Sequence, residues 1–370
     1  MPRINPDIET FARIKVFGVG GSGLNAVDHM IRSKVLGVDF VGVNTDAQDL
    51  HHSLAPKKIH IGKNATRGLG AGMDPNLGRQ AAEENKNEIT ELVRGVDMVF
   101  ITSGFGGGTG TGAGPVIADI ARAEGALTVA VVTRPFTFEG SERSRIAEEG
   151  LERLKAAVDA MIVIPNDRIL SVVEKKTTFL DAFARCDEIL RQAVQGISDL
   201  ITLPGIINVD FADIRSIMKS AGSALMGIGR ASGEDRAREA AKAAINSPLL
   251  DLSIDGAHGV LFSIAGGDDL TMWEVNEAAK VITEPIAKDA KVIFGAVKDE
   301  RLRKGEIKIT VVASGFGEAY AQSPVKSPTL FSSVPKRDEV LVAKPVRPVE
   351  TDESADEWDA IPAFLRRGKK

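Results

Sequence analysis

One stretch of seven residues, Gly106-Gly-Gly-Thr-Gly-Thr-Gly112, contains five glycines and lies between an apolar run and a helical stretch. Because glycine has no Cβ, consecutive backbone N–H groups of such a loop can surround an anion where the helix begins. The hydroxyls of Thr109 and Thr111 add two further donors. A tight turn with positive φ angles is the alternative, but it needs only about one or two glycines. The loop therefore predicts a phosphate site. No Lys-Ser/Thr pair follows it, so it is not a Walker A loop, and backbone amides and a metal must meet the phosphate charge.

A second glycine-rich turn, Gly18-Val-Gly-Gly-Ser-Gly23, also follows a short apolar run. Its pattern fits the dinucleotide fingerprint, in which glycines allow a tight turn and a close approach to a pyrophosphate. That fingerprint also needs an acidic residue at the end of the second strand to bind the ribose. Asn44 occupies this place, and Asp46 lies in the loop beyond it. A dinucleotide-dependent oxidoreductase is therefore an open alternative, although it gives the Gly106–Gly112 loop no role.

Apolar runs alternate with helical stretches in the first half of the chain. Strands are expected at Arg13–Phe17, Val38–Asn44, Asp97–Thr102, Leu127–Thr133 and Ala160–Pro165. Helices are expected from the first glycine turn to about Ser33, near Ile117–Glu124 in a helix entered by Pro115, and over Ser141–Val158. This alternation predicts an α/β fold with a doubly wound, mainly parallel sheet. If the strands before the two glycine loops are neighbours, both loops meet at the carboxyl edge of that sheet.

The second half begins with a long buried helix, expected over Thr178–Ile201 because apolar residues recur there at steps of three and four. Pro204-Gly205 ends this helix. A smaller α+β domain follows, whose strands are expected late in the domain. Its predicted helices lie near Arg215, Asp235–Asn246 and Thr271–Ile286, and its predicted strands are Val260–Ala265, Lys291–Val297 and Glu306–Ala313.

The predicted organisation therefore has six parts. These are an N-terminal extension at 1–12, a nucleotide-binding domain at 13–177, the central helix and its following loop at 178–209, the α+β domain at 210–317, a disordered linker at 318–357 and a partner-binding peptide at 358–370. The linker is assigned on composition, because six of the 16 prolines lie after Gly317 and no core-forming period is present between Gln322 and Glu357.

The end of the chain regains apolar and aromatic residues. Trp358, Ile361, Phe364 and Leu365 precede two arginines, Arg366 and Arg367. Apolar residues at helix-like spacing on a flexible tether are typical of a segment that folds on a partner. The alternative is an accident of composition at a disordered end.

Composition excludes several classes of function. The net charge of −5 gives no overall attraction to nucleic acid or to anionic lipid. The single cysteine, Cys186, excludes an internal disulfide framework and a thiolate zinc site within one chain. The longest apolar runs, such as Leu127–Val132, are too short to cross a bilayer. We therefore expect a cytoplasmic protein that neither binds nucleic acid nor inserts directly into a membrane.

Two acids, Asp210 and Asp213, are three residues apart where a helix is expected to begin. One alternative for Asp210 is a helix N-cap, which is compatible with a functional role. Carboxylates are unfavourable beside a phosphate site of their own chain, because the phosphate charge repels them.

The glycine loop at 106–112 resembles the signature of the tubulin/FtsZ family. The resemblance to bacterial members of this family covers about Ile14 to Gly315 and continues into the tail at Ile361-Pro-Ala-Phe-Leu-Arg-Arg367. Five further motifs carry it: Asn44-Thr-Asp-Ala-Gln48, Arg67-Gly-Leu-Gly-Ala-Gly72, Pro135-Phe-Thr-Phe-Glu-Gly140, Ile164-Pro-Asn-Asp167 and Asn208-Val-Asp-Phe-Ala-Asp213. It implies a GTPase that binds GTP and GDP.

The resemblance also implies which residues bind the phosphates. Backbone N–H groups of Gly20, Gly21 and Gly108–Gly110 contact them, and Ala71 and Gly72 lie near the γ-phosphate. Ser22 stands where the family often has glycine. The remaining loop positions assigned to the nucleotide are Gly23, Leu24, Gly106, Gly107, Thr109, Thr111 and Gly112.

Base and sugar contacts are implied for residues outside the loops. Glu139 and Arg143 are assigned to the ribose and phosphates, although by spacing alone they form a surface pair. Phe183 can stack on a purine, and Asp187 can accept hydrogen bonds from N1–H and the 2-amino group, which guanine has and adenine lacks. Core packing and a solvated helix face are the alternatives for these two. Asn25 and Asn166, otherwise helix caps, are also assigned to the guanine.

For the acids, the resemblance implies a site shared by two subunits. The loop Asn208–Asp213 inserts into the nucleotide site of the next subunit, where Asp210 and Asp213 act on the attacking water. Such a head-to-tail contact builds a filament. By resemblance, this filament forms the division ring at mid-cell. Mg²⁺ is the implied cofactor, and K⁺ is an optional further ion. Trp358–Arg367 would bind membrane-tethering and regulatory division proteins. A GTP-binding module without turnover is the remaining alternative, and it would require the two acids to be missing.

Overall fold

The computed structural model describes residues 12–170, 177–203, 205–247, 253–299 and 301–316. All of these fall in one unit, Met1–Ser323, whereas the second unit, Pro324–Lys370, lies outside the described residues. The predicted linker and terminal peptide, and all but the last residue of the predicted N-terminal extension, also lie outside them. None of the helices in the described residues is long and apolar enough to cross a bilayer.

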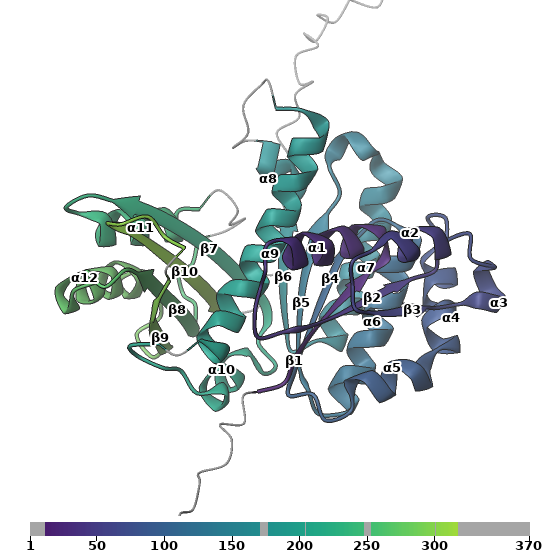
Figure 1. Cartoon of the computed structure of the whole chain (residues 1–370), viewed down its shortest axis with the longest axis horizontal. Helices are drawn as coiled ribbons and strands as arrows, with labels where there is room; N and C mark the ends of the chain where they lie inside the picture. The colour runs from purple at the N-terminus through teal and green to yellow at the C-terminus, as the bar shows by residue number, and fades with distance from the viewer. Residues whose placement is uncertain (1–11, 171–176, 204, 248–252, 300, 317–370) are drawn as a thin grey trace, which may run out of the picture. The chain divides into compact units, whose positions relative to one another are not determined.

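Six parallel strands form the first part of the sheet, in the order β3-β2-β1-β4-β5-β6 (Figure 1). Their bounds are β1 Ile14–Val19, β2 Asp39–Asn44, β3 Lys57–His60, β4 Met98–Gly104, β5 Leu127–Arg134 and β6 Ala160–Pro165. The strand order reverses between β1 and β4, so the sheet is doubly wound and the predicted fold class is confirmed.

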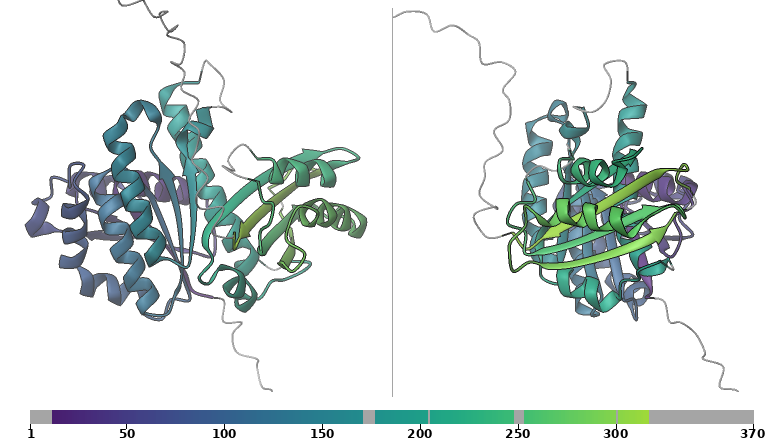
Figure 2. Two further views of the ribbon diagram at one scale, coloured as in Figure 1. Left: turned by 180° about the vertical axis from the view of Figure 1, so that it is seen from behind. Right: turned by 90° about the vertical axis from the view of Figure 1, so that its left-hand side faces the viewer.

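Helices cover both faces of this sheet. Their bounds are α1 Gly20–Arg32, α2 Ala47–His52, α3 Lys63–Thr66, α4 Pro75–Glu84, α5 Lys86–Val93, α6 Gly108–Ala123, η1 Thr137–Glu139, α7 Ser141–Ala157 and α8 Asn166–Leu170. Side chains that alternate along β1 and β4 separate into two cores. Val16 and Phe100 pack with α1 and the long helix α9, whereas Phe17 and Ile101 pack with α4 to α7, which are seen from behind in Figure 2.

The expected long helix is present as α9, Phe179–Thr202. Its apolar stripe is buried in the core at Cys186, Leu190, Val194 and Ile197, as the three- and four-residue steps predict. At about 1.5 Å per residue its 24 residues span roughly 36 Å. The helix begins beside Phe136, which follows β5, and ends beside Gly37, which precedes β2, so it runs from the carboxyl edge of the parallel sheet to its amino edge.

The second half carries its own helices and strands. They are α10 Phe211–Met218, β7 Gly222–Ser232, α11 Arg236–Ile245, β8 Gly259–Gly266, α12 Met272–Thr283, β9 Lys291–Lys298 and β10 Glu306–Ser314. The strand order is β7-β10-β8-β9, with β10 antiparallel to both of its neighbours. A third core, which includes Phe262 and Ile282, lies between these strands and α11 and α12.

The expectation that strands lie late in this half is wrong, because β7 comes directly after α10. Glycines at 222, 227 and 229 conceal this strand in the sequence, since glycine is depleted in strands. Gly229 is required by packing, because a Cβ there would lie 1.9 Å from the carbonyl oxygen of Ala240 on α11. At its start β7 also pairs in parallel with β6, so both halves share one ten-stranded sheet.

Two helices begin earlier than the sequence suggests. Helix α1 begins at Gly20 and α6 at Gly108, each inside its glycine loop. Pro115, expected at the entrance of a helix, therefore lies inside α6. The region between Ala47 and Val93, to which no elements were assigned from sequence, contains β3 and four short helices, α2 to α5.

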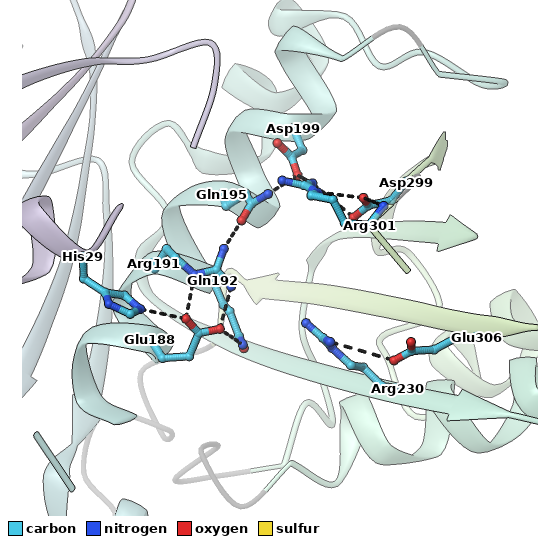
Figure 3. Close-up of polar contacts among 10 residues, drawn as sticks. All are labelled: His29, Glu188, Arg191, Gln192, Gln195, Asp199, Arg230, Asp299, Arg301 and Glu306. Atoms are coloured by element: carbon cyan, nitrogen blue, oxygen red, sulfur yellow. Dashed lines mark hydrogen bonds and ion pairs between the residues drawn. The ribbon is translucent and has the colours of Figure 1, made fainter. Parts of the chain in front are cut away.

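A row of polar side chains follows α9 on the side that faces the second half (Figure 3). His29 Nε2 of α1 lies 2.9 Å from Glu188 Oε2. Arg191 joins Glu188 to Gln195, which in turn donates to Asp199 at 3.1 Å. Arg301, between β9 and β10, reaches Asp199 at 3.4 Å. The row links α1 to the second half of the chain through α9.

Candidate functional site

The two glycine loops lie side by side. Strand β1 pairs with β4, with Gly18 opposite Thr102, so both loops emerge from adjacent strands at the carboxyl edge. A Cβ on Gly20 would lie 3.1 Å from the backbone nitrogen of Gly110, and Ser103 Oγ donates to the carbonyl oxygen of Val19 at 2.9 Å. The two strands are therefore neighbours, and both loops meet at one edge of the sheet as predicted.

Each of these loops opens directly into a helix N-terminus. Neither Val19, which precedes α1, nor Gly107, which precedes α6, supplies a side-chain cap. The first turns of both helices also lack acidic residues. Uncapped N–H groups and the positive ends of two helix dipoles therefore meet at one place, which suits a phosphate chain.

Gly107 has open space on its side-chain side, because a Cβ there would meet no atom within 4 Å. Ser22 presents its hydroxyl against the other loop, since a Cβ on Gly104 would lie 2.7 Å from Ser22 Oγ. The serine thus fits between the two loops, where the family often has glycine.

A third loop completes this edge. A Cβ on Gly108 would lie 2.9 Å from Ala71 Cβ, so the loop that contains Ala71 and Gly72 packs directly on the start of α6. Gly72 has a φ angle of +53° and open space around its missing side chain. The hydroxyls of Thr45 and Thr109 lie 2.6 Å apart and connect the end of β2 to the second glycine loop.

Some loop residues have a packing role that the sequence does not distinguish from binding. A Cβ on Gly112 would lie 2.0 Å from the carbonyl oxygen of Pro75, and one on Gly23 would lie 2.5 Å from that of Thr102. Gly106 has a φ angle of +100°, and its N–H donates to Thr111 Oγ1 at 3.0 Å. Leu24 is buried, so its side chain belongs to the core.

Candidate base-binding residues gather between η1, α8 and α9. The ring of Phe183 meets that of Phe136 edge to face with centroids 5.4 Å apart, and Phe138 stacks on Phe136 at 4.9 Å. Asn166 is buried at the start of α8, and its Oδ1 has no hydrogen-bond partner. An orphaned buried acceptor is costly, and a donor on a bound ligand would satisfy it.

Asp187, one turn after Phe183, is half-buried. Burial raises its pKa to about 6, and the nearby His29 opposes the rise only in part. Its ionised form therefore has few protein partners and is suited to accept from two N–H donors of a ligand. Asn25 lies on the second turn of α1 and is exposed, so the alternative of a helix cap is wrong for this residue.

Glu139 and Arg143 form the pair that their spacing predicts. Arg143 Nη1 lies 2.5 Å from Glu139 Oε2, and Glu139 Oε1 accepts from the backbone N–H of Phe136 at 2.9 Å. Both residues follow β5, at the same edge of the sheet as the glycine loops. The pair is therefore near the candidate site whichever role it has.

The acidic residues lie at the opposite edge. Helix α9 ends at Thr202. Gly37 lies in the loop that enters β2, and a Cβ on Gly37 would lie 2.5 Å from Thr202 Oγ1. Asn208, Asp210 and Asp213 come after this end and are exposed. Asp210 and Asp213 lie at the start of α10, the helix labelled in Figure 1. Asp210 is the N-cap residue of α10, yet its carboxylate makes no capping bond. One chain therefore does not bring these acids to its own glycine loops.

Comparisons with known proteins show the family of this chain. Residues 13–174 match the tubulin/FtsZ family, GTPase domain, and residues 222–317 match the FtsZ family, C-terminal domain. An FtsZ dimer from M. jannaschii is 46% identical over 83% of this chain and 89% of that chain, with a TM-score of 0.79. The chain belongs to the tubulin/FtsZ family. It is a GTP-binding and GTP-hydrolysing protein of the tubulin-like cytoskeleton of cell division.

More distant structures share the fold. CetZ2 from Haloferax volcanii, a GTPγS-bound protofilament, has a TM-score of 0.69 at 21% identity over 83% of this chain and 94% of that chain. CetZ1 from the same organism, a GDP-bound monomer, has a TM-score of 0.69 at 22% identity over 83% of this chain and 95% of that chain. Membership of the GTPase family removes the dinucleotide-oxidoreductase alternative.

Sequence reasoning missed the side chains that link the loops. The motif Asn44–Gln48 contains both Asn44 and Thr45, but its pattern does not indicate that either side chain links the two loops. Asn44 is buried at the end of β2, where its Oδ1 accepts from the N–H of Thr45 at 2.9 Å. A polar pair directly after a buried strand was the available signal, because such residues lie at the carboxyl edge of a parallel sheet.

Proposed function

We propose that this GTPase assembles head to tail into a filament, and that each active site is completed by the neighbouring subunit. The observation that carries the proposal is a separation within one chain. The glycine loops lie at the carboxyl edge of the sheet, whereas Asp210 and Asp213 lie at its amino edge. Helix α9, which is roughly 36 Å long, runs between the two edges. Stacking copies in one direction brings the two edges together. A contact of this kind does not close on itself and gives a filament.

In the proposed reaction, a water oxygen attacks the γ-phosphorus of GTP, and the bond to the β–γ bridging oxygen breaks. The products are GDP and phosphate, and the water loses a proton. Asp210 and Asp213 of the neighbour accept from this water and orient it, and Asn208 supports the loop by accepting from the N–H of Gly205 at 2.6 Å. Backbone N–H groups of Gly20, Gly21 and the start of α6 stabilise the phosphate charge.

Guanine recognition is proposed for the group between α1, α8 and α9. Phe183 stacks on the base, Asp187 accepts from N1–H and the 2-amino group, and the orphaned Oδ1 of Asn166 accepts a further donor. Asn25 contributes from α1, while Glu139 and Arg143 bind the ribose and phosphates. The support is that these residues share one edge with the glycine loops.

Mg²⁺ is proposed as the cofactor, with K⁺ as a further ion. No group of three or more His, Cys, Asp or Glu side chains that could hold a metal is found among the residues that the structure describes. This fits an ion bound mainly by triphosphate oxygens and water, the usual mode for Mg²⁺ with nucleotides. Such an ion would offset phosphate charge during hydrolysis.

At the level of the cell, we propose that the filament forms the cytoplasmic division ring at mid-cell of a bacterium. Trp358–Arg367 would bind membrane-tethering and regulatory division proteins. Deletion of Trp358–Lys370 should leave GTP turnover unchanged and abolish binding to a membrane-bound adaptor. A loss of turnover would show that this peptide belongs to the folded part instead.

A mixing experiment tests the shared site. Asp213→Ala keeps the glycine loops and should bind GTP without turnover. Gly107→Leu should block the nucleotide site and still fold, because no atom lies within 4 Å of a Cβ at this position. Gly107→Leu retains Asp210 and Asp213, whereas Asp213→Ala retains an open nucleotide site. A mixture of these two inactive proteins should therefore hydrolyse GTP wherever the acids of a Gly107→Leu subunit meet the nucleotide site of an Asp213→Ala subunit.

Turnover per subunit, measured against protein concentration with light scattering in parallel, gives the reference. Wild-type turnover and scattering should rise together above a threshold. Two results would mean that one chain holds a complete site. One is a mixture of variants that co-assembles but does not hydrolyse GTP, and the other is wild-type turnover that does not depend on protein concentration.

A further inference from the structure

Asp49, on the first turn of α2, is directed toward the first glycine loop. A Cβ on Gly21 would lie 3.1 Å from Asp49 Oδ2, so the carboxylate rests against the backbone that begins α1. Gly21 is one of the residues proposed to bind phosphate. A negative charge beside an anion site is unexpected, and neither the sequence motifs nor the proposed reaction gives Asp49 a role.

The carboxylate anchors a chain of hydrogen bonds that reaches the second loop. Asn44 Nδ2 donates to Asp49 Oδ2 at 2.7 Å. The other end of the same amide, Asn44 Oδ1, accepts from the N–H of Thr45, whose hydroxyl lies 2.6 Å from that of Thr109. Asp49 therefore fixes the orientation of a buried amide on which the position of Thr45 depends.

The groups facing Asp49 leave its charge largely uncompensated. Burial, then Asp46 at the N-cap of α2 and Asp28 on α1, raise its pKa, whereas the Asn44 amide and His52 lower it. Asp46 accepts from two backbone N–H groups, and Asp28 from Ser53 and Leu54, so both have donors of their own. In the described part of the chain Asp49 has no lysine or arginine partner, and Asn44 is the donor to its carboxylate.

We propose that Asp49 is a positioning residue of the GTP site whose charge also limits the preference for triphosphate over diphosphate. The inference rests on the proposed function, because it assumes that phosphates lie at Gly21. The hydrogen bond to Asn44 keeps Thr45 and Thr109 in place. The charge repels the bound phosphates, and it repels GTP more than GDP because GTP carries more negative charge.

Two substitutions separate these effects. Asp49→Asn removes the charge and keeps an oxygen that can accept from the Asn44 amide. Asp49→Ala removes both the charge and the acceptor. Asp39→Asn, an exposed acid where β2 begins, at the far edge of the sheet, is the control for a change in net charge.

Dissociation constants for GTP and GDP are measured on the full chain by fluorescent-nucleotide displacement, below the concentration of assembly. Asp49→Asn should tighten GTP by roughly three- to tenfold and GDP by less, with the difference shrinking as salt is raised. Asp49→Ala should lose turnover (kcat) through the displaced Thr45–Thr109 pair, and Asp49→Asn should retain it.

Each outcome decides a different question. One contrary result is that Asp49→Asn leaves both affinities unchanged, or changes those for GTP and GDP by the same factor, while wild type and Asp39→Asn bind GTP normally. Either form of this result would overturn the proposed role of the charge and leave the positioning role standing. Equal turnover in the Asn and Ala variants would overturn the positioning role. Failure of the folded wild-type chain to bind GTP would instead overturn the proposed nucleotide site itself.

Discussion

The hydroxyl oxygens of Thr45 and Thr109 lie 2.6 Å apart, and this hydrogen bond joins the end of β2 to the first turn of α6. The two residues are 64 positions apart in the chain and belong to different loops of the candidate site. Their contact makes the geometry of the second glycine loop depend on the residue that directly follows β2.

Thr109→Val should therefore weaken GTP binding, by roughly tenfold, because it removes a hydroxyl from a partly buried pair without changing side-chain size. Thr109→Ser, which keeps the hydroxyl, should stay within about threefold of wild type. Equilibrium titration with GTP measures both. Equal losses in the Val and Ser variants would indicate that the methyl group, and not the hydrogen bond, is what matters at this position.

Two glycines of α6 should differ sharply when replaced by alanine. A Cβ on Gly112 would lie 2.0 Å from the carbonyl oxygen of Pro75, so Gly112→Ala should lower the free energy of unfolding by about 2–4 kcal/mol. Gly114 has its nearest such contact at 3.8 Å, and Gly114→Ala should be neutral or stabilise by up to about 1 kcal/mol through helix propensity. Urea unfolding of the two variants tests this, and similar losses in both would contradict a packing role specific to Gly112.

Guanine affinity should depend on pH through Asp187. Burial raises the pKa of this carboxyl to about 6, and only the ionised form accepts from both guanine donors. GTP affinity should therefore fall as the pH is lowered from 7 to 5. Asp187→Asn should bind GTP more weakly at pH 7, lose preference over ATP and show a flat profile over this range. A variant that keeps the wild-type profile would assign the titration to another group.

The contact of Glu188 with α1 and α9 should contribute to stability. Burial opposes ionisation of this carboxyl, but hydrogen bonds from Arg191, His29 and Gln192 outweigh it and lower the pKa to about 2. Glu188→Gln should therefore lower the free energy of unfolding at pH 7 by about 1–3 kcal/mol. Glu149→Gln, at an exposed pair with Arg145, should cost less than about 0.5 kcal/mol.

The pH dependence of this contribution has a definite sign. Because the pKa of Glu188 is lower in the folded chain, its contribution is complete above the ordinary value of 4.5 and is lost as the pH falls toward about 2. The difference in unfolding free energy between wild type and Glu188→Gln should shrink over this range. A difference that stays constant from pH 7 to pH 3 would mean that the charge of Glu188 does not carry the effect.

Much of the fold could be predicted from local pattern. The apolar runs of the parallel strands and the stripe of α9 result from burial on both faces of a sheet or on one side of a helix, and such patterns are visible in sequence. Strand β7 was missed because its glycines are placed by the approach of α11, a contact between distant residues. The start of α6 at Gly108 was missed for a related reason, since a run of glycines has low helix propensity and is held there by its neighbours.

The candidate site shows the same limit. Glycine spacing indicated a phosphate loop, but it does not separate Gly107, which faces open space, from Gly112, which packs against Pro75. The helix that separates the acids from the glycine loops, α9, was predicted from its apolar stripe, but its direction along the sheet was not. The chain from Asp49 to Thr109 was not predicted either, because it depends on which loops the strand order brings together.

Strand β7 joins the two parts of the ten-stranded sheet. Its first residues, Gly222–Ala224, pair with β6, and Leu225–Ser232 pair with β10. The two halves of the molecule are thus connected by a continuous hydrogen-bonded ribbon in addition to α9. The paired strand therefore restrains any rotation of one half against the other. Such a rotation would twist β7 near Ala224 and Leu225, where its pairing changes from β6 to β10. The strand is thus an elastic connection between the GTP-binding half and the half that carries β8 to β10.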